Sequence, residues 1–301
     1  MISFIILMSI VVCFSAILAL ALNFQWGLGG MVNFGLAGFY ALGAYACALL
    51  MLKWGFNTFF ATLGAMAIVA LVCGIVAFVT LRVTEEDYFA IVTLGVGEML
   101  RLIALNEDKL TKGALGLTGI PRPFGDSVPP EYYQYFMLAL SVALLLATLW
   151  FLNVLARSPF GRIVRAVRED DVVAATLGKP VLWARVRIFA IGGAFIGLAG
   201  SLHAFYYQYI DPTQFSNIVI AYAFMAVIAG GRGAHSGTIL GAAAVMILIE
   251  GSRFAKDLIP ALDSDQLAAI RIIIIGVGLI LLLIFRPHGF MREYRLQVQL
   301  K

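Results

Sequence analysis

Charged residues are scarce in this chain. Only 13% of its 301 residues are Asp, Glu, Lys or Arg, and the first 52 residues contain none of them. Soluble globular domains carry about 25% charged residues, so the composition excludes an ordinary soluble domain. Hydrophobic residues make up 62% of the chain, and the apolar runs lack the alternation of a transmembrane β-barrel. The sequence therefore predicts an all-α, polytopic transmembrane helical bundle that forms a single domain over residues 1–301.

Cysteine and histidine are also sparse. Cys13, Cys47 and Cys73 lie inside apolar runs and lack the paired spacing of a disulfide framework or a metal site. We interpret them as small buried apolar side chains. His203 lies alone within another apolar run, where a hydrogen-bonded packing role is the simpler interpretation. The sequence suggests no metal site and no catalytic residues.

A nucleotide-binding motif is absent as well. The sequence contains no GxxxxGK[ST] segment, so we expect no phosphate cradle of the P-loop type in this chain. Its net charge of +4 is small, and the basic residues flank apolar runs. We interpret that charge as a determinant of membrane topology and expect no nucleic-acid partner.

Nine apolar runs mark the predicted membrane spans, with eight to ten as the range. They cover residues 2–22, 30–52, 58–81, 88–105, 132–156, 188–209, 218–231, 237–249 and 267–285. The first run lacks the basic flank of a signal peptide, so we expect a retained helix. The seventh and eighth runs are shorter than the roughly 20 residues that a span needs. They are consistent with partial helices that meet inside the membrane.

The loops set the predicted orientation. The positive-inside rule assigns residues 157–187 and the basic C-terminal tail to the cytoplasm. With nine crossings, the loop 106–131 is then extracytoplasmic and the N-terminus lies outside.

The charged loop 157–187 is the longest such segment between apolar runs. It holds Arg157, Arg162, Arg165, Arg168, Lys179, Arg185 and Arg187, together with Glu169, Asp170 and Asp171. Residues 163–177 are predicted to form one amphipathic helix, because Gly178 favours a helix end and Pro180 prevents continuation. Such a helix can dock in a partner's groove, with its charges fixing the register. An interfacial helix held by anionic lipid is the alternative.

Two glycine-rich stretches, residues 27–45 and 229–241, interrupt apolar runs in the two halves of the chain. Paired interruptions of this kind are typical of a central translocation site. Asn33, Gly230 and Gly231 are therefore candidate path residues, although Asn33 could equally be a packing residue bonded to a neighbour. Glu98 is a further candidate, and its spacing from Arg101 also allows a structural ion pair.

Four segments together resemble the permease subunits of branched-chain amino-acid ABC importers, in the LivM-like branch. They are GLGGMVNFGLAGFYALGAY, VTLGVGEMLRL with LTKGALGLTGIPRP, SPFGRIVRAVREDDVVAATLG, and AVIAGGRGAHSGTILGA. They follow the family's order over residues 27–242. The central loop followed by the Gly-rich 191–202 segment is the most specific feature.

The resemblance implies a non-enzymatic permease in a bacterial-type inner membrane that translocates branched-chain or similar small amino acids by alternating access. Its partners would be a sister permease in a heterodimer, two cytoplasmic ATPases that bind ATP and Mg²⁺, and an extracytoplasmic solute-binding protein. The ATPase-coupling residues would be Arg162, Arg165, Arg168, Glu169, Asp170, Asp171 and Gly178. Related permeases serve urea or short amides. A self-sufficient channel or secondary carrier for a small polar solute, and a membrane scaffold, are alternatives from other classes.

Overall fold

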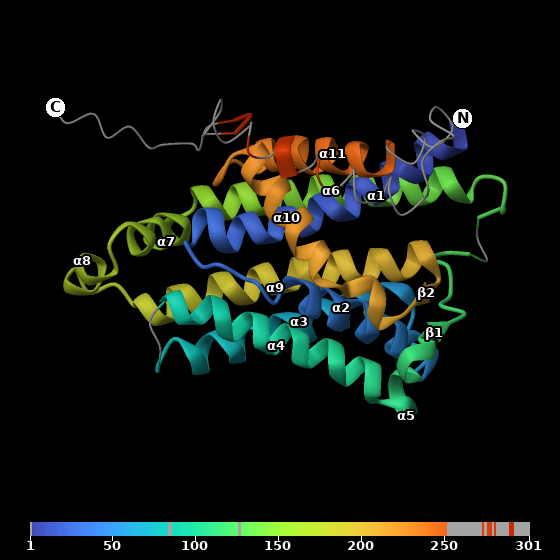
Figure 1. Cartoon of the computed structure of the whole chain (residues 1–301), viewed down its shortest axis with the longest axis horizontal. Coiled ribbons are helices and arrows are strands. Elements are labelled where there is room, and N and C mark those ends of the chain that lie inside the picture. The colour runs from blue at the N-terminus through green and yellow to red at the C-terminus, as the bar shows by residue number, and fades with distance from the viewer. Residues whose placement is uncertain are drawn as a thin grey trace.

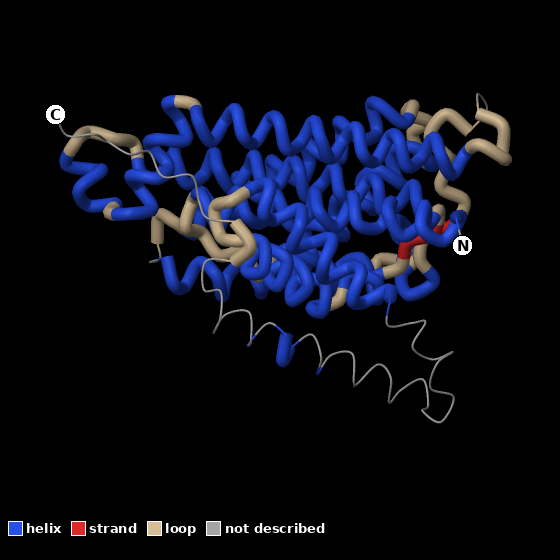
Figure 2. The backbone as a smooth tube through the Cα atoms, turned by 90° about the horizontal axis from the view of Figure 1, so that it is seen from above, coloured by secondary structure: helices blue, strands red, loops and turns tan. Residues whose placement is uncertain are grey.

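The computed structural model describes residues 2–83, 86–125 and 128–251, together with residues 273, 276–278, 280 and 289–291. The described chain is a helical bundle, and Figure 2 shows two short strands at one end of it. The long helices are α1 (Ile2–Leu22), α3 (Thr58–Thr80), α4 (Glu86–Asn106), α6 (Tyr133–Arg157) and α9 (Val181–Tyr207). The shorter apolar helices are α2 (Leu36–Leu52), α10 (Asn217–Gly230) and α11 (His235–Gly251). A helical membrane bundle, as predicted, is consistent with these elements.

Short elements fill the connections. They are the π-helix η1 (Asn23–Leu28), α5 (Asp108–Thr111), the 3₁₀-helix η2 (Gly113–Leu115), β1 (Leu117–Thr118), α7 (Pro159–Glu169), α8 (Asp171–Thr176), β2 (Tyr209–Ile210) and the 3₁₀-helix η3 (Pro212–Phe215). Strands β1 and β2 pair antiparallel, with Leu117 opposite Ile210. This pairing fastens the loop after α5 to the end of α9.

Five helical segments among the described residues are long and apolar enough to cross a membrane. They are Ser3–Leu28, Thr58–Thr80, Tyr88–Asn106, Tyr133–Arg157 and Val181–Tyr207. The predicted runs 30–52, 218–231 and 237–249 correspond to the three shorter apolar helices. The ninth predicted run, 267–285, lies almost entirely outside the described residues. The structure therefore supports the helical character of eight predicted runs.

Helix α9 is the centre of the bundle, and its glycines explain why. Gly193 faces α3, where an added Cβ would lie 2.7 Å from the Cys73 sulfur. On its face towards α2, a Cβ at Gly200 would lie 2.6 Å from the Tyr40 carbonyl oxygen. Small residues let apolar helices approach this closely in a membrane, where packing replaces the hydrophobic effect. Cys13, Cys47 and Cys73 are free and buried, as the sequence predicted.

The two long loops lie at opposite ends of the bundle (Figure 1). At one end, Trp183 at the start of α9 packs on Phe78 near the end of α3, with ring centroids 5.6 Å apart. At the other end, the Lys53 ammonium donates a hydrogen bond of 2.8 Å to the carbonyl of Lys109. Figure 1 shows α7 and α8 beyond the first end and α5 with the strands at the second. Successive apolar helices therefore cross the bundle in alternating directions.

Candidate functional site

The charged loop folds as two helices rather than one. The prediction of a single helix over residues 163–177 is wrong, because Asp170 is extended, with φ −158° and ψ 107°. Its carboxylate oxygen Oδ1 accepts a hydrogen bond of 2.9 Å from the backbone N–H of Val173. Aspartate is among the residues that best cap a helix start. Asp170 therefore ends α7 and begins α8.

Gly178 ends α8, as predicted from the sequence. It adopts φ +72°, a conformation that glycine adopts without strain. Its N–H donates to the Ala175 carbonyl at 2.9 Å, and the N–H of Lys179 donates to the Ala174 carbonyl at 3.0 Å. These two bonds form a Schellman motif. Because α8 is closed at both ends by specific bonds, its short length is compatible with a defined shape.

Helices α7 and α8 differ in how far their apolar side chains are buried. Val164, Val167 and Ala174 are buried against the bundle. In contrast, Val172, Val173 and Leu177 are 68%, 52% and 71% exposed, and we call these three side chains the α8 patch. The Asp171 carboxylate accepts a charged hydrogen bond of 3.2 Å from Arg185 on α9. The ion pair between Asp171 and Arg185 therefore connects α8, and with it the α8 patch, to the bundle.

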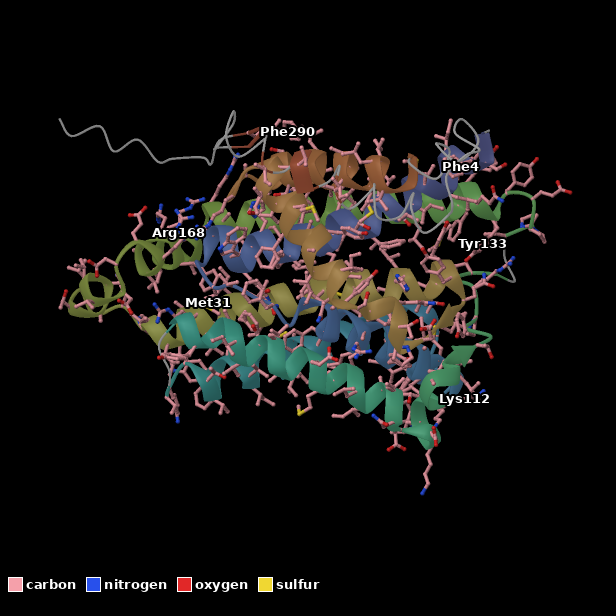
Figure 3. All side chains as sticks on the ribbon, viewed as in Figure 1. Phe4, Met31, Lys112, Tyr133, Arg168 and Phe290 are labelled. Atoms are coloured by element: carbon pink, nitrogen blue, oxygen red, sulfur yellow. The ribbon has the colours of Figure 1, made fainter. Side chains whose placement is uncertain are left out.

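The predicted coupling residues separate into two groups. Arg162, Glu169, Asp170 and Gly178 are exposed, whereas Arg165, Arg168 and Asp171 are partly buried. The Arg168 guanidinium donates from Nη1 to the Gly27 carbonyl oxygen in η1. Figure 3 shows Arg168 and Met31 at the same end of the bundle. Arg168 therefore joins the charged loop to the first glycine-rich stretch.

The two glycine-rich stretches meet in space. A Cβ added at Gly27 would lie 2.6 Å from the backbone nitrogen of Gly233. That same N–H donates a hydrogen bond of 2.8 Å to Oδ1 of Asn23. Gly231 and Gly233 have φ values of +107° and +82°, conformations that favour glycine at this turn. Residues some 200 positions apart thus form one close backbone contact.

Gly230 is the last residue of α10, and Gly231 begins the tight turn to α11. A Cβ at Gly230 would overlap the carbonyl oxygen of Gly237 on α11. The Gly230 carbonyl also accepts a hydrogen bond of 3.1 Å from the N–H of Met291. Phe290, labelled in Figure 3, donates from its N–H to the Ala229 carbonyl at 2.8 Å. The segment that joins α10 to α11 therefore contacts both η1 and the described C-terminal residues.

Asn33 lies in a buried polar network beside this contact. Its Nδ2 donates to Oε1 of Gln25 at 2.8 Å, and its Oδ1 accepts from the N–H of Gly35 at 3.0 Å. Gln25 in turn donates to the Phe189 carbonyl at 2.9 Å. Asn33 thus has the bonded neighbour that a packing role requires. Asn23 and Gln25 are not among the residues that the sequence predicts for the site, although they are the first amide side chains of an uncharged region.

Glu98 forms the ion pair that its spacing predicted. On α4, its Oε1 lies 2.5 Å from Nη2 of Arg101, and the two side chains are 36% and 24% exposed. The residue before Glu98, Gly97, packs on the first glycine-rich stretch, where a Cβ added to it would lie 2.6 Å from the Cα of Gly35. His203 is hydrogen-bonded through both ring nitrogens, which agrees with its predicted packing role.

The chain is similar to known membrane transport proteins along almost its whole length. The family described as "Branched-chain amino acid transport system / permease component" matches residues 2–283. The high-affinity branched-chain amino acid transport system permease protein LivM of Salmonella typhimurium is 31% identical over 95% of this chain and 69% of the relative. LivH of Escherichia coli is 25% identical over 75% of this chain and 77% of the relative. The guanosine ABC transporter permease protein NupQ of Bacillus subtilis is 29% identical over 58% and 59%.

Proposed function

The chain belongs to the family of branched-chain amino acid transport permease components, and we propose that it is the membrane subunit of an ATP-driven importer for branched-chain or similar small amino acids. Relatives named LivM and LivH both match it, which supports pairing with a sister permease in a heterodimer. Two ATPase subunits and a solute-binding protein complete the proposed assembly. ATP and Mg²⁺ bind to the ATPases.

The proposed topology has nine crossings. The eight described apolar helices alternate in direction, and the run 267–285 supplies the ninth. We assign the end with α7 and α8 to the cytoplasm, since loop 157–187 has the greater basic excess. The N-terminus and the loop 106–131 then lie outside, and the C-terminus lies inside a bacterial-type plasma membrane.

The observation that carries the proposal is the α8 patch. Three aliphatic side chains at the tip of a charged loop are 52–71% exposed, and the capped ends of α8 hold them in place. Apolar side chains that are exposed on one subunit and surrounded by charged residues are typical of a helix that docks in a partner's groove. We propose that the patch enters the ATPase and that Arg162 and Glu169 on the surface set its register.

Transport would proceed by alternating access. ATP-driven closure of the two ATPases displaces α7 and α8. Arg168 transmits that displacement to Gly27, and the contact between Gly27 and Gly233 passes it to the α10–α11 turn. This chain then contributes half of the path and no covalent chemistry. The candidates for residues that line the translocation path, or at which its helices bend, are Asn33, Glu98, Gly230 and Gly231.

The family is not restricted to one transported solute. The match to a guanosine permease favours a family scaffold that accepts several small solutes. Urea or a short amide, which the family resemblance implies, is the second candidate cargo. The alternative of another class, a self-sufficient channel or carrier, predicts solute flux through the purified chain without ATP.

The docking role is tested by co-purification of the permease with its ATPases. Leu177→Glu should lose the ATPases, because it places a charge in the apolar contact. Leu115→Glu is the matched control, since Leu115 is 80% exposed at the opposite end of the bundle. Glu169→Arg and Gly178→Pro should keep affinity for the binding protein while uncoupling ATP hydrolysis from uptake. Normal retention of the ATPases by Leu177→Glu, or normal uptake in the other two variants, would contradict the docking role.

A further inference from the structure

A cavity of about 380 Å³ lies between α1, α2, α9, η3, α10 and α11. Small-molecule sites occupy roughly 300–1,000 Å³, so this cavity has the size for a small solute. Its polar lining residues are Ser15, Tyr40, His203, Tyr207, Gln214 and Tyr222. A larger groove of about 650 Å³ between α3, α6 and α9 is lined almost wholly by apolar residues, and it does not suit a polar solute.

One wall of the cavity carries a hydrogen-bonded chain. The Tyr40 hydroxyl lies 2.9 Å from Nδ1 of His203, and Nε2 of His203 lies 2.9 Å from Oε1 of Gln214. A carboxamide oxygen only accepts hydrogen bonds, so with this amide orientation the histidine proton is on Nε2 and Tyr40 donates to Nδ1. After these two hydrogen bonds, the N–H donors of Gln214 and a lone pair of the Tyr40 hydroxyl are available to a ligand.

Aromatic rings gather around His203 on the same wall. Its ring centroid lies 5.6 Å from Phe14, 5.3 Å from Tyr40 and 4.6 Å from Tyr207. Phe14, Tyr40 and Tyr207 also line the cavity, and the faces of aromatic rings attract ammonium groups. Together with the hydrogen-bonding groups, they offer separate partners for the ammonium and the carboxylate of an amino acid.

The part of the lining that comes from α10 and α11 is largely apolar. Val219, Ala223 and Ala226 of α10 face the cavity together with Val245 and Met246 of α11. None of the described lining residues is Asp, Glu, Lys or Arg. A solute with a net charge would lose its hydration here without a counter-charge. The lining therefore favours a solute that is neutral overall and has an aliphatic part.

We propose that this cavity is a transit site that holds one aliphatic amino acid during translocation. The inference rests on the proposed importer function and identifies where this subunit contacts the cargo. Neutral partners give modest affinity, which allows release. The walls from α10 and α11 meet at the turn that contacts Gly27, so displacement of α7 through Arg168 would reshape the cavity.

Photo-crosslinking locates the cargo directly. The full complex, in proteoliposomes with its binding protein and ATP, is supplied with photoactivatable leucine and irradiated. We expect crosslinks in α10 and α11 peptides that line the cavity, and we expect them to disappear with excess leucine. Leucine-competed crosslinks found only elsewhere on this chain, in a complex that imports leucine, would overturn the transit site.

Variants give a second readout. Gln214→Leu should raise the leucine concentration for half-maximal uptake by about tenfold, the equivalent of one lost hydrogen bond to a charged group. Gln134→Leu, on the exposed start of α6, is the matched control. Val219→Phe fills the cavity without removing a polar group and should depress uptake while ATP hydrolysis continues.

The two proposals fail differently. If the wild-type complex shows no ATP-driven leucine import, the importer function itself is wrong. If the wild-type complex imports leucine, and Gln214→Leu and Val219→Phe import it with wild-type rate and concentration dependence, only the transit site is wrong.

Discussion

The Arg168 side chain on α7 donates a hydrogen bond to the carbonyl oxygen of Gly27, 141 residues earlier in the chain. A Cβ at Gly30 would lie 2.9 Å from Cγ of the same arginine, so the stem of the side chain also packs on the glycine-rich stretch. This contact connects the charged loop to the place where the first helix is interrupted. It joins the charged loop to the bundle.

Arg168→Gln should separate ATP hydrolysis from transport. A hydrogen bond to a charged group contributes about 1.5–3 kcal/mol to stability. Loss of the bond between Arg168 and Gly27 should therefore weaken the contact between α7 and η1 without unfolding the bundle. We expect uptake per ATP hydrolysed to fall about tenfold while the ATPases still co-purify. Arg162→Gln, an exposed change on the same helix, is the control. If both variants take up the same amount of solute per ATP hydrolysed, Arg168 does not transmit the movement of α7 to the bundle.

Gly27→Ala should destabilise the protein by about 1–3 kcal/mol through overpacking. The new Cβ would overlap Oδ1 of Asn23 and crowd the backbone nitrogen of Gly233. Gly95→Ala in α4 is the matched control, because nothing lies within 4 Å of its Cβ position. Thermal unfolding in detergent should show a lower midpoint for Gly27→Ala alone. An unchanged midpoint would mean that the two glycine-rich stretches are not in close contact.

Asn33→Leu tests whether this residue packs or lines a path. A packing role predicts a loss of about 1–3 kcal/mol of stability, since Oε1 of Gln25 and the Gly35 N–H lose their partner in a buried site. The double variant Gln25→Leu/Asn33→Leu should lose less free energy of unfolding than the sum of the losses in the two single variants. The control is Asn106→Leu on the exposed end of α4. Changed leucine uptake at unchanged stability would instead support a path-lining role.

Asp170→Ala should weaken α8 by about 1 kcal/mol, the usual effect of losing a helix N-cap. Asp170→Asn is the matched variant, because asparagine caps a helix about as well without the charge. We expect fewer ATPases to co-purify with Asp170→Ala and normal amounts with Asp170→Asn. If both variants lose the ATPases equally, the charge of Asp170 matters rather than its cap.

Local sequence signals identified much of this fold. The apolar runs, the buried cysteines and the helix end at Gly178 follow from hydropathy and from backbone preferences. The break at Asp170 was missed because two adjacent aspartates fit the polar face of one continuous helix equally well. Only the extended backbone shows that Asp170 begins a second helix.

Long-range contacts account for what the sequence could not predict. Arg168 is one of several arginines in a charged loop, and no local pattern distinguishes it from the exposed Arg162. The glycine-rich stretches were recognised as a pair, but their contact through Asn23, Gly27 and Gly233 depends on packing. The cavity beside Tyr40 likewise combines short parts of α1, α2, α9, η3, α10 and α11.

The most direct test of the central claim is leucine uptake into proteoliposomes that hold this chain with its sister permease and two ATPases. We predict uptake that requires both ATP on the ATPase side and the solute-binding protein on the other side. The matched sample contains this chain alone and should show no uptake. ATP-independent leucine flux through the chain alone would contradict the account, because it would identify a self-sufficient channel or carrier.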